Sequence, residues 1–80
     1  MPLPDTSSGD SLADRRADYA EMLFADGDFA AAADLMTDAL ERAPGWSFGW
    51  FRLAEFYEAA RDMDKAIEAW RMAARIDADD

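Results

Sequence analysis

Apolar residues recur every three or four positions from residue 11 onwards, and three short interruptions divide this pattern into four segments. Such spacing is typical of amphipathic helices, which bury one face and expose the other. In chain order, the apolar positions are Tyr19, Ala20, Leu23 and Phe24; Phe29, Ala32, Ala33, Met36, Ala39 and Leu40; Trp50, Leu53, Ala54 and Tyr57; and Met63, Ala66, Ile67, Trp70, Ala73 and Ala74. No segment alternates with the period of two that a strand requires. We therefore predict an all-α fold.

Turn-forming residues lie at each interruption. Gly27 can adopt the left-handed conformation that ends a helix, and Asp28 can cap the start of the next helix. Pro44 ends the second helix because it has no N–H donor and disfavours helical geometry at the residue before it. A third turn is predicted around Arg61 and Asp62. The pattern therefore predicts four helices joined by short turns.

The first helix is expected to follow a flexible leader over residues 1–12, which is rich in Pro, Ser and Gly near its start. Ser11, with Asp14 three residues later, resembles a capping box and is predicted to cap this helix. Ser47 is the predicted N-cap of the third helix.

The chain repeats itself when it is shifted by 34 residues. Identical pairs are Ala20 and Ala54, Glu21 and Glu55, Ala25 and Ala59, Asp28 and Asp62, Ala32 and Ala66, and Ala39 and Ala73. Similar apolar pairs accompany them at Leu23 and Tyr57, Phe29 and Met63, and Met36 and Trp70. A fixed period of this length indicates stacked copies of one supersecondary unit.

A 34-residue helix-turn-helix period resembles the tetratricopeptide repeat (TPR) family. Residues 13–46 match the family pattern at Tyr19, Ala20, Leu23, Gly27, Phe29, Ala32, Met36, Ala39 and Pro44. Residues 47–80 match it at Trp50, Leu53, Ala54, Tyr57, Met63, Ala66, Trp70 and Ala73. The resemblance implies two TPR helix-turn-helix repeats, whose four antiparallel helices form a short right-handed α-solenoid.

Three positions depart from the family pattern. Arg16 replaces the first aromatic residue, Arg61 replaces the turn glycine, and Ala78 replaces the closing proline. A left-handed conformation at Arg61 would cost on the order of 1 to 2 kcal/mol.

The composition narrows the possible chemistry. Eighteen acidic and eight basic residues give a net charge of -10, and the chain contains neither His nor Cys. Disulfides and the common zinc sites are thereby excluded, and no cofactor is expected. An acidic chain repels phosphate backbones, so neither nucleic acid nor an anionic membrane is an expected partner. No signal sequence or membrane-spanning run is visible, and we expect a cytoplasmic protein.

Catalysis and calcium binding find little support. The stretch from Asp62 to Asp64 begins like a calcium loop, but it is followed by neither the glycine nor the bidentate glutamate that such loops require. No nucleophile, base and oxyanion donor form a recognisable set. We therefore expect this chain not to be an enzyme.

The resemblance implies that the first helix of each repeat lines a concave groove. The residues placed there are Asp14, Ala17, Glu21, Phe24, Phe48, Phe51, Arg52, Glu55 and Glu58. Aromatic anchors between acidic flanks would suit a basic or apolar protein segment. The alternative is that the phenylalanines pack between helices while the acids are solvated. In the aromatic run nearby, we expect Trp50 to fill the core of its repeat and Trp46 to close the loop between repeats.

The second repeat ends at Asp80 without the polar capping helix that helical arrays normally carry. An exposed apolar strip is therefore expected on the fourth helix, at Ile67, Trp70, Met72, Ala74 and Ile76. Such a strip would dock a downstream domain of the same chain or form a homodimer contact.

These observations favour a protein–protein interaction module, a scaffold or adaptor. The stretch from Pro44 to Glu55 resembles the amino-terminal TPR segment of bacterial proteins that carry a methyltransferase domain downstream. The segment has no Gly-rich loop for a methyl donor, so any such activity would belong to the longer protein. The alternative is a stand-alone small TPR protein that forms homo-oligomers through its uncapped C-terminal helix.

Overall fold

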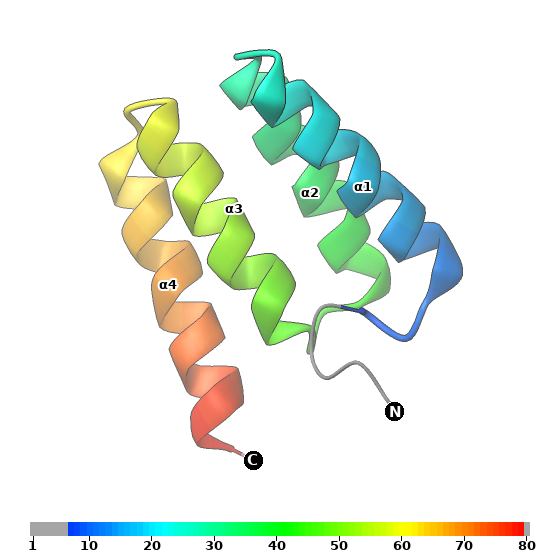
Figure 1. Cartoon of the computed structure of the whole chain (residues 1–80). Helices are drawn as coiled ribbons and strands as arrows, with labels where there is room; N and C mark the ends of the chain where they lie inside the picture. Colours follow the sequence, from blue (N-terminus) through cyan, green and yellow to red (C-terminus); the bar gives the residue numbers. More distant parts are fainter. Residues whose placement is uncertain (1–6, 80) are drawn as a thin grey trace.

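The computed structural model describes residues 7–79 of the chain, and Figure 1 shows its four helices. They are α1 (Ser11–Ala25), α2 (Phe29–Arg42), α3 (Ser47–Ala59) and α4 (Met63–Ala78). Successive helices run antiparallel, and α1 packs on α2, α2 on α3, and α3 on α4. No strand occurs within residues 7–79. The predicted all-α fold of two helix-turn-helix units is confirmed.

Small residues fill the contacts between helices. The alanines with at most 5% of their surface exposed include the three repeat pairs Ala20 and Ala54, Ala32 and Ala66, and Ala39 and Ala73. The largest fully buried side chains are Phe56 and Met36. Buried alanines let helix backbones approach closely, which gives a physical reason for their recurrence every 34 residues.

The two intra-repeat turns share one geometry. Gly27 and Arg61 both have positive φ, at 85° and 65°. The N–H of Asp28 donates to the Leu23 carbonyl at 2.9 Å, and the N–H of Asp62 donates to the Tyr57 carbonyl at 2.8 Å. Together with the bonds from residues 27 and 61 to the third carbonyl before each, they form Schellman motifs. The predicted left-handed turns are confirmed, including the one at arginine.

The cap of α1 differs from the prediction. Asp10, not Ser11, is the N-cap, and its carboxylate accepts from the Ala13 N–H at 2.9 Å. Asp14 instead accepts hydrogen bonds from Ser8, which precedes the helix. The capping-box prediction was wrong because an aspartate one residue earlier competes for the same N–H groups. The helix also begins inside the expected leader, whose residues 1–6 lie outside the described part of the chain.

The cap of α3 also differs. Trp46 occupies the N-cap position and makes no capping hydrogen bond with its side chain, so the prediction of Ser47 as the cap was wrong. Trp46 is instead buried, at 8% exposure, in the hydrophobic core. Trp50 is half-buried, and its indole N–H donates to the Pro44 carbonyl at 2.8 Å. Packing of Trp46 against the core therefore fixes the start of α3 where a polar cap was expected.

Within the described residues, no helix combines the length and apolar character needed to cross a membrane.

Candidate functional site

An arginine joins the two repeats on the side where α1 and α3 face each other. Arg52 on α3 donates from Nε and Nη2 to the Glu21 carboxylate on α1, at 2.7 and 2.5 Å. Its Nη1 donates to Glu55 at 2.6 Å, one helical turn along α3. The hydrogen bonds to Glu21 raise the pKa of Arg52 above its usual range, and those to Glu55 add to the effect. One cation thus compensates half of the charge of two acids that were predicted to flank the groove.

Aromatic rings lie beneath this arginine. The Phe24 ring stacks on the Phe56 ring with centroids 4.7 Å apart and also contacts Phe29 at 5.2 Å. The Arg52 guanidinium carbon lies 5.4 Å from the Phe24 centroid and 5.0 Å from the Phe56 centroid, within range of cation–π attraction. Phe24 therefore packs between helices, which supports the packing alternative over the anchor alternative for this residue.

A cavity of about 230 Å³ opens between α1 and α3, next to this cluster. Its lining consists of Ser7, Asp14, Ala17, Asp18, Glu21, Met36, Trp46 and Phe48. The Trp46 and Phe48 rings form one apolar wall, with centroids 5.9 Å apart. The carboxylates come from α1 alone, so the cavity is acidic on one side and apolar on the other.

The two aspartates of this cavity differ in their surroundings. Asp14 accepts from the Ser8 hydroxyl at 2.6 Å, from the Ser8 N–H at 2.8 Å and from the Ser7 hydroxyl at 3.0 Å. These bonds, chiefly the one from the Ser8 hydroxyl, lower the pKa of Asp14 below its ordinary value and keep it ionised. Asp18 is exposed and forms no ion pair within residues 7–79. Its charge is therefore available to a ligand.

The predicted groove residues do not form one continuous surface. Asp14, Ala17, Glu21 and Phe48 meet at the cavity described above. Phe51 instead lines a different cavity with Ala73 and Asp77 of α4, and Glu58 lies beside Met63 at the turn between α3 and α4. The second group therefore borders the outer face of the second repeat and not the space between the repeats.

Three lining residues of the α1–α3 cavity were not among the predicted site residues: Asp18, Met36 and Trp46. Asp18 could have been found, because Asp14, Asp18 and Glu21 are spaced by four and three residues and share one helix face. Met36 and Trp46 had only the signal of apolar core positions, and their proximity to the groove depends on how the repeats stack.

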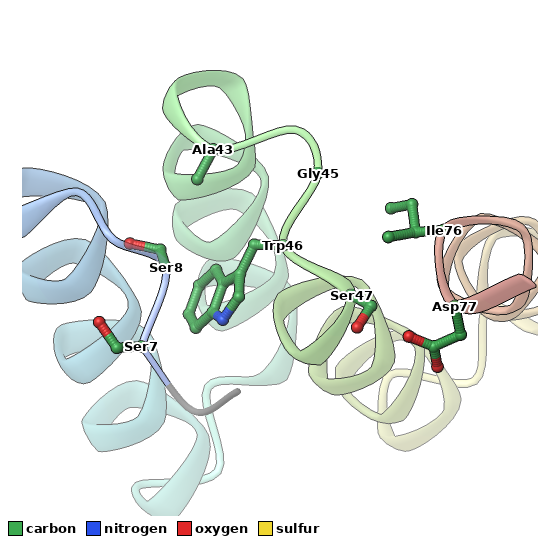
Figure 2. Close-up of a pocket in the computed structure, with 8 residues that line it drawn as sticks. All are labelled: Ser7, Ser8, Ala43, Gly45, Trp46, Ser47, Ile76 and Asp77. Atoms are coloured by element: carbon green, nitrogen blue, oxygen red, sulfur yellow. The ribbon is translucent and has the colours of Figure 1, made fainter. Parts of the chain in front are cut away.

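A second cavity, of about 350 Å³, lies at the other end of the molecule and is shown in Figure 2. Trp46 points toward Ser7 and Ser8, while Ile76 and Asp77 of α4 lie beyond the start of α3 (Figure 2). The lining residues are Ser7, Ser8, Ala43, Gly45, Trp46, Ser47, Ile76 and Asp77. Their polar groups are hydroxyls and a single carboxylate, which form no recognisable catalytic set.

The strip expected on α4 divides into two parts. Ile67, Trp70 and Ala74 are spaced by three and four residues and share one side of the helix. Met72 lines a cavity with Trp50 and other residues on the opposite side of the buried alanines, and Ile76 lines the cavity in Figure 2. Only the first three residues therefore belong to a common outward face.

The family follows from comparison with known proteins. The tetratricopeptide repeat family model matches residues 23–80, which is more than half of the chain. The chain belongs to the tetratricopeptide repeat family. TPR units are helical scaffolds that bind proteins or peptides on their extended surfaces, and they are not catalytic domains. Searches of curated proteins and of solved structures each returned no match.

Proposed function

We propose that this TPR unit binds a basic, partly apolar segment of another protein in the cavity between α1 and α3. The observation that carries the proposal is the juxtaposition of Asp18, which has no ion-pair partner in the described chain, with the apolar wall of Trp46 and Phe48. Asp14 adds a second carboxylate that its serine partners keep ionised.

Lysine and arginine side chains suit such a cavity. Their aliphatic stems can pack on an apolar wall while the cationic ends approach the carboxylates of α1. An arginine could also stack on the exposed part of the aromatic wall. The net charge of -10 would attract a cationic segment and accelerate its association at low ionic strength.

The test compares labelled peptides of equal length that pair leucine with lysine, with glutamine or with glutamate. We expect the lysine peptide to bind most tightly in fluorescence anisotropy titrations. Asp18→Lys should weaken its binding about tenfold or more, since it replaces attraction by repulsion. Asp18 is a better test position than Glu21 or Glu55, because those two residues hold Arg52 in place.

Asp38→Lys is the matched control, because Asp38 is exposed on α2, does not line this cavity, and undergoes the same change in charge. Equal weakening by both variants would mean that only the overall charge matters. Tighter binding of the glutamate peptide, or no effect of Asp18→Lys, would refute the groove.

A second candidate function is self-association through the outward face of the second repeat. Its support is the exposure of large apolar side chains there, with Phe51 at 49% and Ile67 at 40%. Light scattering over a range of protein concentrations tests it. An average mass that rises above one chain supports this function, and a mass of one chain at the highest concentration contradicts it.

A longer bacterial parent protein with a downstream methyltransferase domain stays a prediction, supported only by the resemblance of residues 44–55. In that protein, the groove or the outward face would position a substrate protein or the catalytic domain. The coding sequence after codon 80 tests it. A strand followed by a Gly-rich loop would support the methyltransferase parent, and an immediate stop codon would contradict it.

A further inference from the structure

Six large hydrophobic side chains are exposed in the described part of the chain, and they fall into two groups. One group lies on α1 and the other on α3 and α4, at opposite ends of the helix stack (Figure 1). The α1 group is Leu12, Tyr19 and Met22, and the other group is Phe51, Met63 and Ile67. The 34-residue repeat offers a way to ask what each group would contact.

The second group corresponds to the surface that receives α3 in the first repeat. A shift of 34 residues pairs Phe51 with Ala17, and Ile67 with Ala33, which are only 6% and 1% exposed. Trp70 and Ala74 likewise correspond to Met36 and Leu40, which are 1% and 3% exposed. In the first repeat these positions lie in the core that forms where α2 packs on α3. We call Phe51, Ile67, Trp70 and Ala74 the receiving face.

The first group corresponds to the surface that α3 itself presents. Leu12 pairs with Trp46, Tyr19 with Leu53, and Met22 with Phe56. The three α3 counterparts are 8%, 2% and 0% exposed, whereas Leu12, Tyr19 and Met22 are 37%, 57% and 63% exposed. We call Leu12, Tyr19 and Met22 the inserting face. The chain therefore exposes one half of its own inter-repeat interface at each end.

We infer that two copies of this chain associate head to tail, with the inserting face of one copy on the receiving face of the other. This inference rests on the second candidate function and specifies its geometry. Within each chain, α3 lies on the first repeat, and between chains α1 of the next copy takes the equivalent place on the second repeat. The contact joins two different surfaces, so it is heterologous and leaves a free face at each end.

Side-chain sizes at the two faces are compatible with this contact. Within the chain, Gly49 allows close approach, since a Cβ there would lie 2.9 Å from Leu40. The positions equivalent to Gly49 and Leu40 hold Arg15 and Ala74. A larger residue on the inserting side is thus matched by a smaller one on the receiving side, which conserves the space between the helices.

Charges near the two faces are opposite in sign. Arg15 and Arg16 accompany the inserting face and form no ion pair within residues 7–79. Glu58 and Asp77 border the receiving face, each beside one of its cavities, and they likewise lack ion-pair partners in that part of the chain. Local attraction across the contact therefore opposes the general repulsion between two chains of charge -10.

One interaction of the internal interface is not reproduced between copies. The positions equivalent to Glu21 and Arg52 would hold Glu55 of one copy and Asp18 of the next. The inter-copy contact lacks this ion pair, so it is weaker than the interface within the chain. Association is therefore expected to depend on concentration.

The experiment uses one charged variant on each face, Tyr19→Glu on the inserting face and Ile67→Glu on the receiving face. Sedimentation equilibrium of the unaltered chain should show an average mass that passes beyond two chains as concentration rises. Each variant alone should associate about tenfold more weakly or less. An equimolar mixture should recover a mass of two chains, because each variant retains the face that the other lacks.

Ala30→Glu is the matched control, since it adds the same charge at an exposed position of α2 outside both faces. It should associate like the unaltered chain, and circular dichroism should show that all three variants remain helical. An unaltered chain that stays monomeric overturns both self-association and its geometry. A chain that stops at two copies, with Tyr19→Glu still dimerising, overturns only the head-to-tail arrangement and favours a symmetric dimer. A mixture that remains monomeric also overturns it.

Discussion

Arg52 of α3 donates two hydrogen bonds to the carboxylate of Glu21 on α1 and thereby joins the two repeats on the groove side. Within residues 7–79 it is the only ion pair that connects one repeat with the other, because the remaining ion pairs stay inside a repeat. Packing between α2 and α3 is otherwise apolar at its centre. The angle between the repeats, and hence the width of the groove, depends on this pair together with that packing.

Arg52→Ala should lower the free energy of unfolding by about 1 to 3 kcal/mol, since it removes three charge-assisted hydrogen bonds and the contact with two rings. Arg52→Lys should recover only part of the loss, because an ammonium group cannot bind Glu21 through two parallel bonds. Urea denaturation provides the measurement. Lys65→Ala is the control, because the exposed pair of Lys65 with Asp62 at 3.9 Å should contribute less than about 1 kcal/mol. Equal losses at the two positions would contradict a special role for Arg52.

Gly49→Ala should destabilise the fold by about 1 to 3 kcal/mol. The added Cβ would collide with the Trp46 ring and approach Leu40 to 2.9 Å, which outweighs the gain of about 1 kcal/mol in helix propensity. The thermal unfolding midpoint should fall accordingly. Gly45→Ala serves as the comparison, because no atom lies within 4 Å of a Cβ at that position. A midpoint for Gly49→Ala at or above that of the unaltered chain would show that the helices separate at little cost.

Arg61→Gly should stabilise the chain by about 0.5 to 1 kcal/mol, because glycine adopts a φ of 65° without the steric cost that a Cβ brings. The equivalent position supplies the reverse test. Gly27→Ala should destabilise by a similar amount, since its φ is 85°. Chemical denaturation of both variants should give shifts of opposite sign. Shifts of the same sign would mean that the turns do not share the energetics that their shared hydrogen bonds indicate.

The stabilising effect of Asp14 should disappear in acid. Its pKa is lower in the folded chain than its ordinary value of 3.8, so folding favours the ionised form. The contribution is complete above about pH 4 and is lost as the pH falls through the lowered pKa. Asp14→Asn should therefore be less stable than the unaltered chain at pH 7, and the difference should shrink below pH 4. Urea midpoints measured at several pH values test this, and a constant difference would contradict it.

The helices and turns could be predicted because they depend on local spacing. Alternating small and large apolar residues define the helices, and even the left-handed Arg61 follows from its alignment with Gly27. The caps were harder, because neighbouring polar residues compete for the same N–H groups. Asp10 prevailed at α1, while burial of Trp46 took precedence over a polar cap at α3.

The site was predicted less completely, because a helix face does not reveal which neighbour covers it. Glu21 and Glu55 looked like free acids, although Arg52 lies between them. Phe51 and Phe24 looked alike in sequence, although one is exposed beside α4 and the other stacks on Phe56. These differences depend on the angle at which the repeats stack, which the spacing of residues does not contain.

The order of packing has a consequence for local unfolding. Helices α2 and α3 each pack on two neighbours, whereas α1 and α4 each pack closely on one. Amide hydrogens near Met36 and Leu53 should therefore exchange with solvent most slowly, while those of α1 and α4 exchange through opening of an outer helix. A further copy stacked on either end would convert an outer helix into an inner one. Slower exchange at the ends of the molecule would thus be a direct record of assembly.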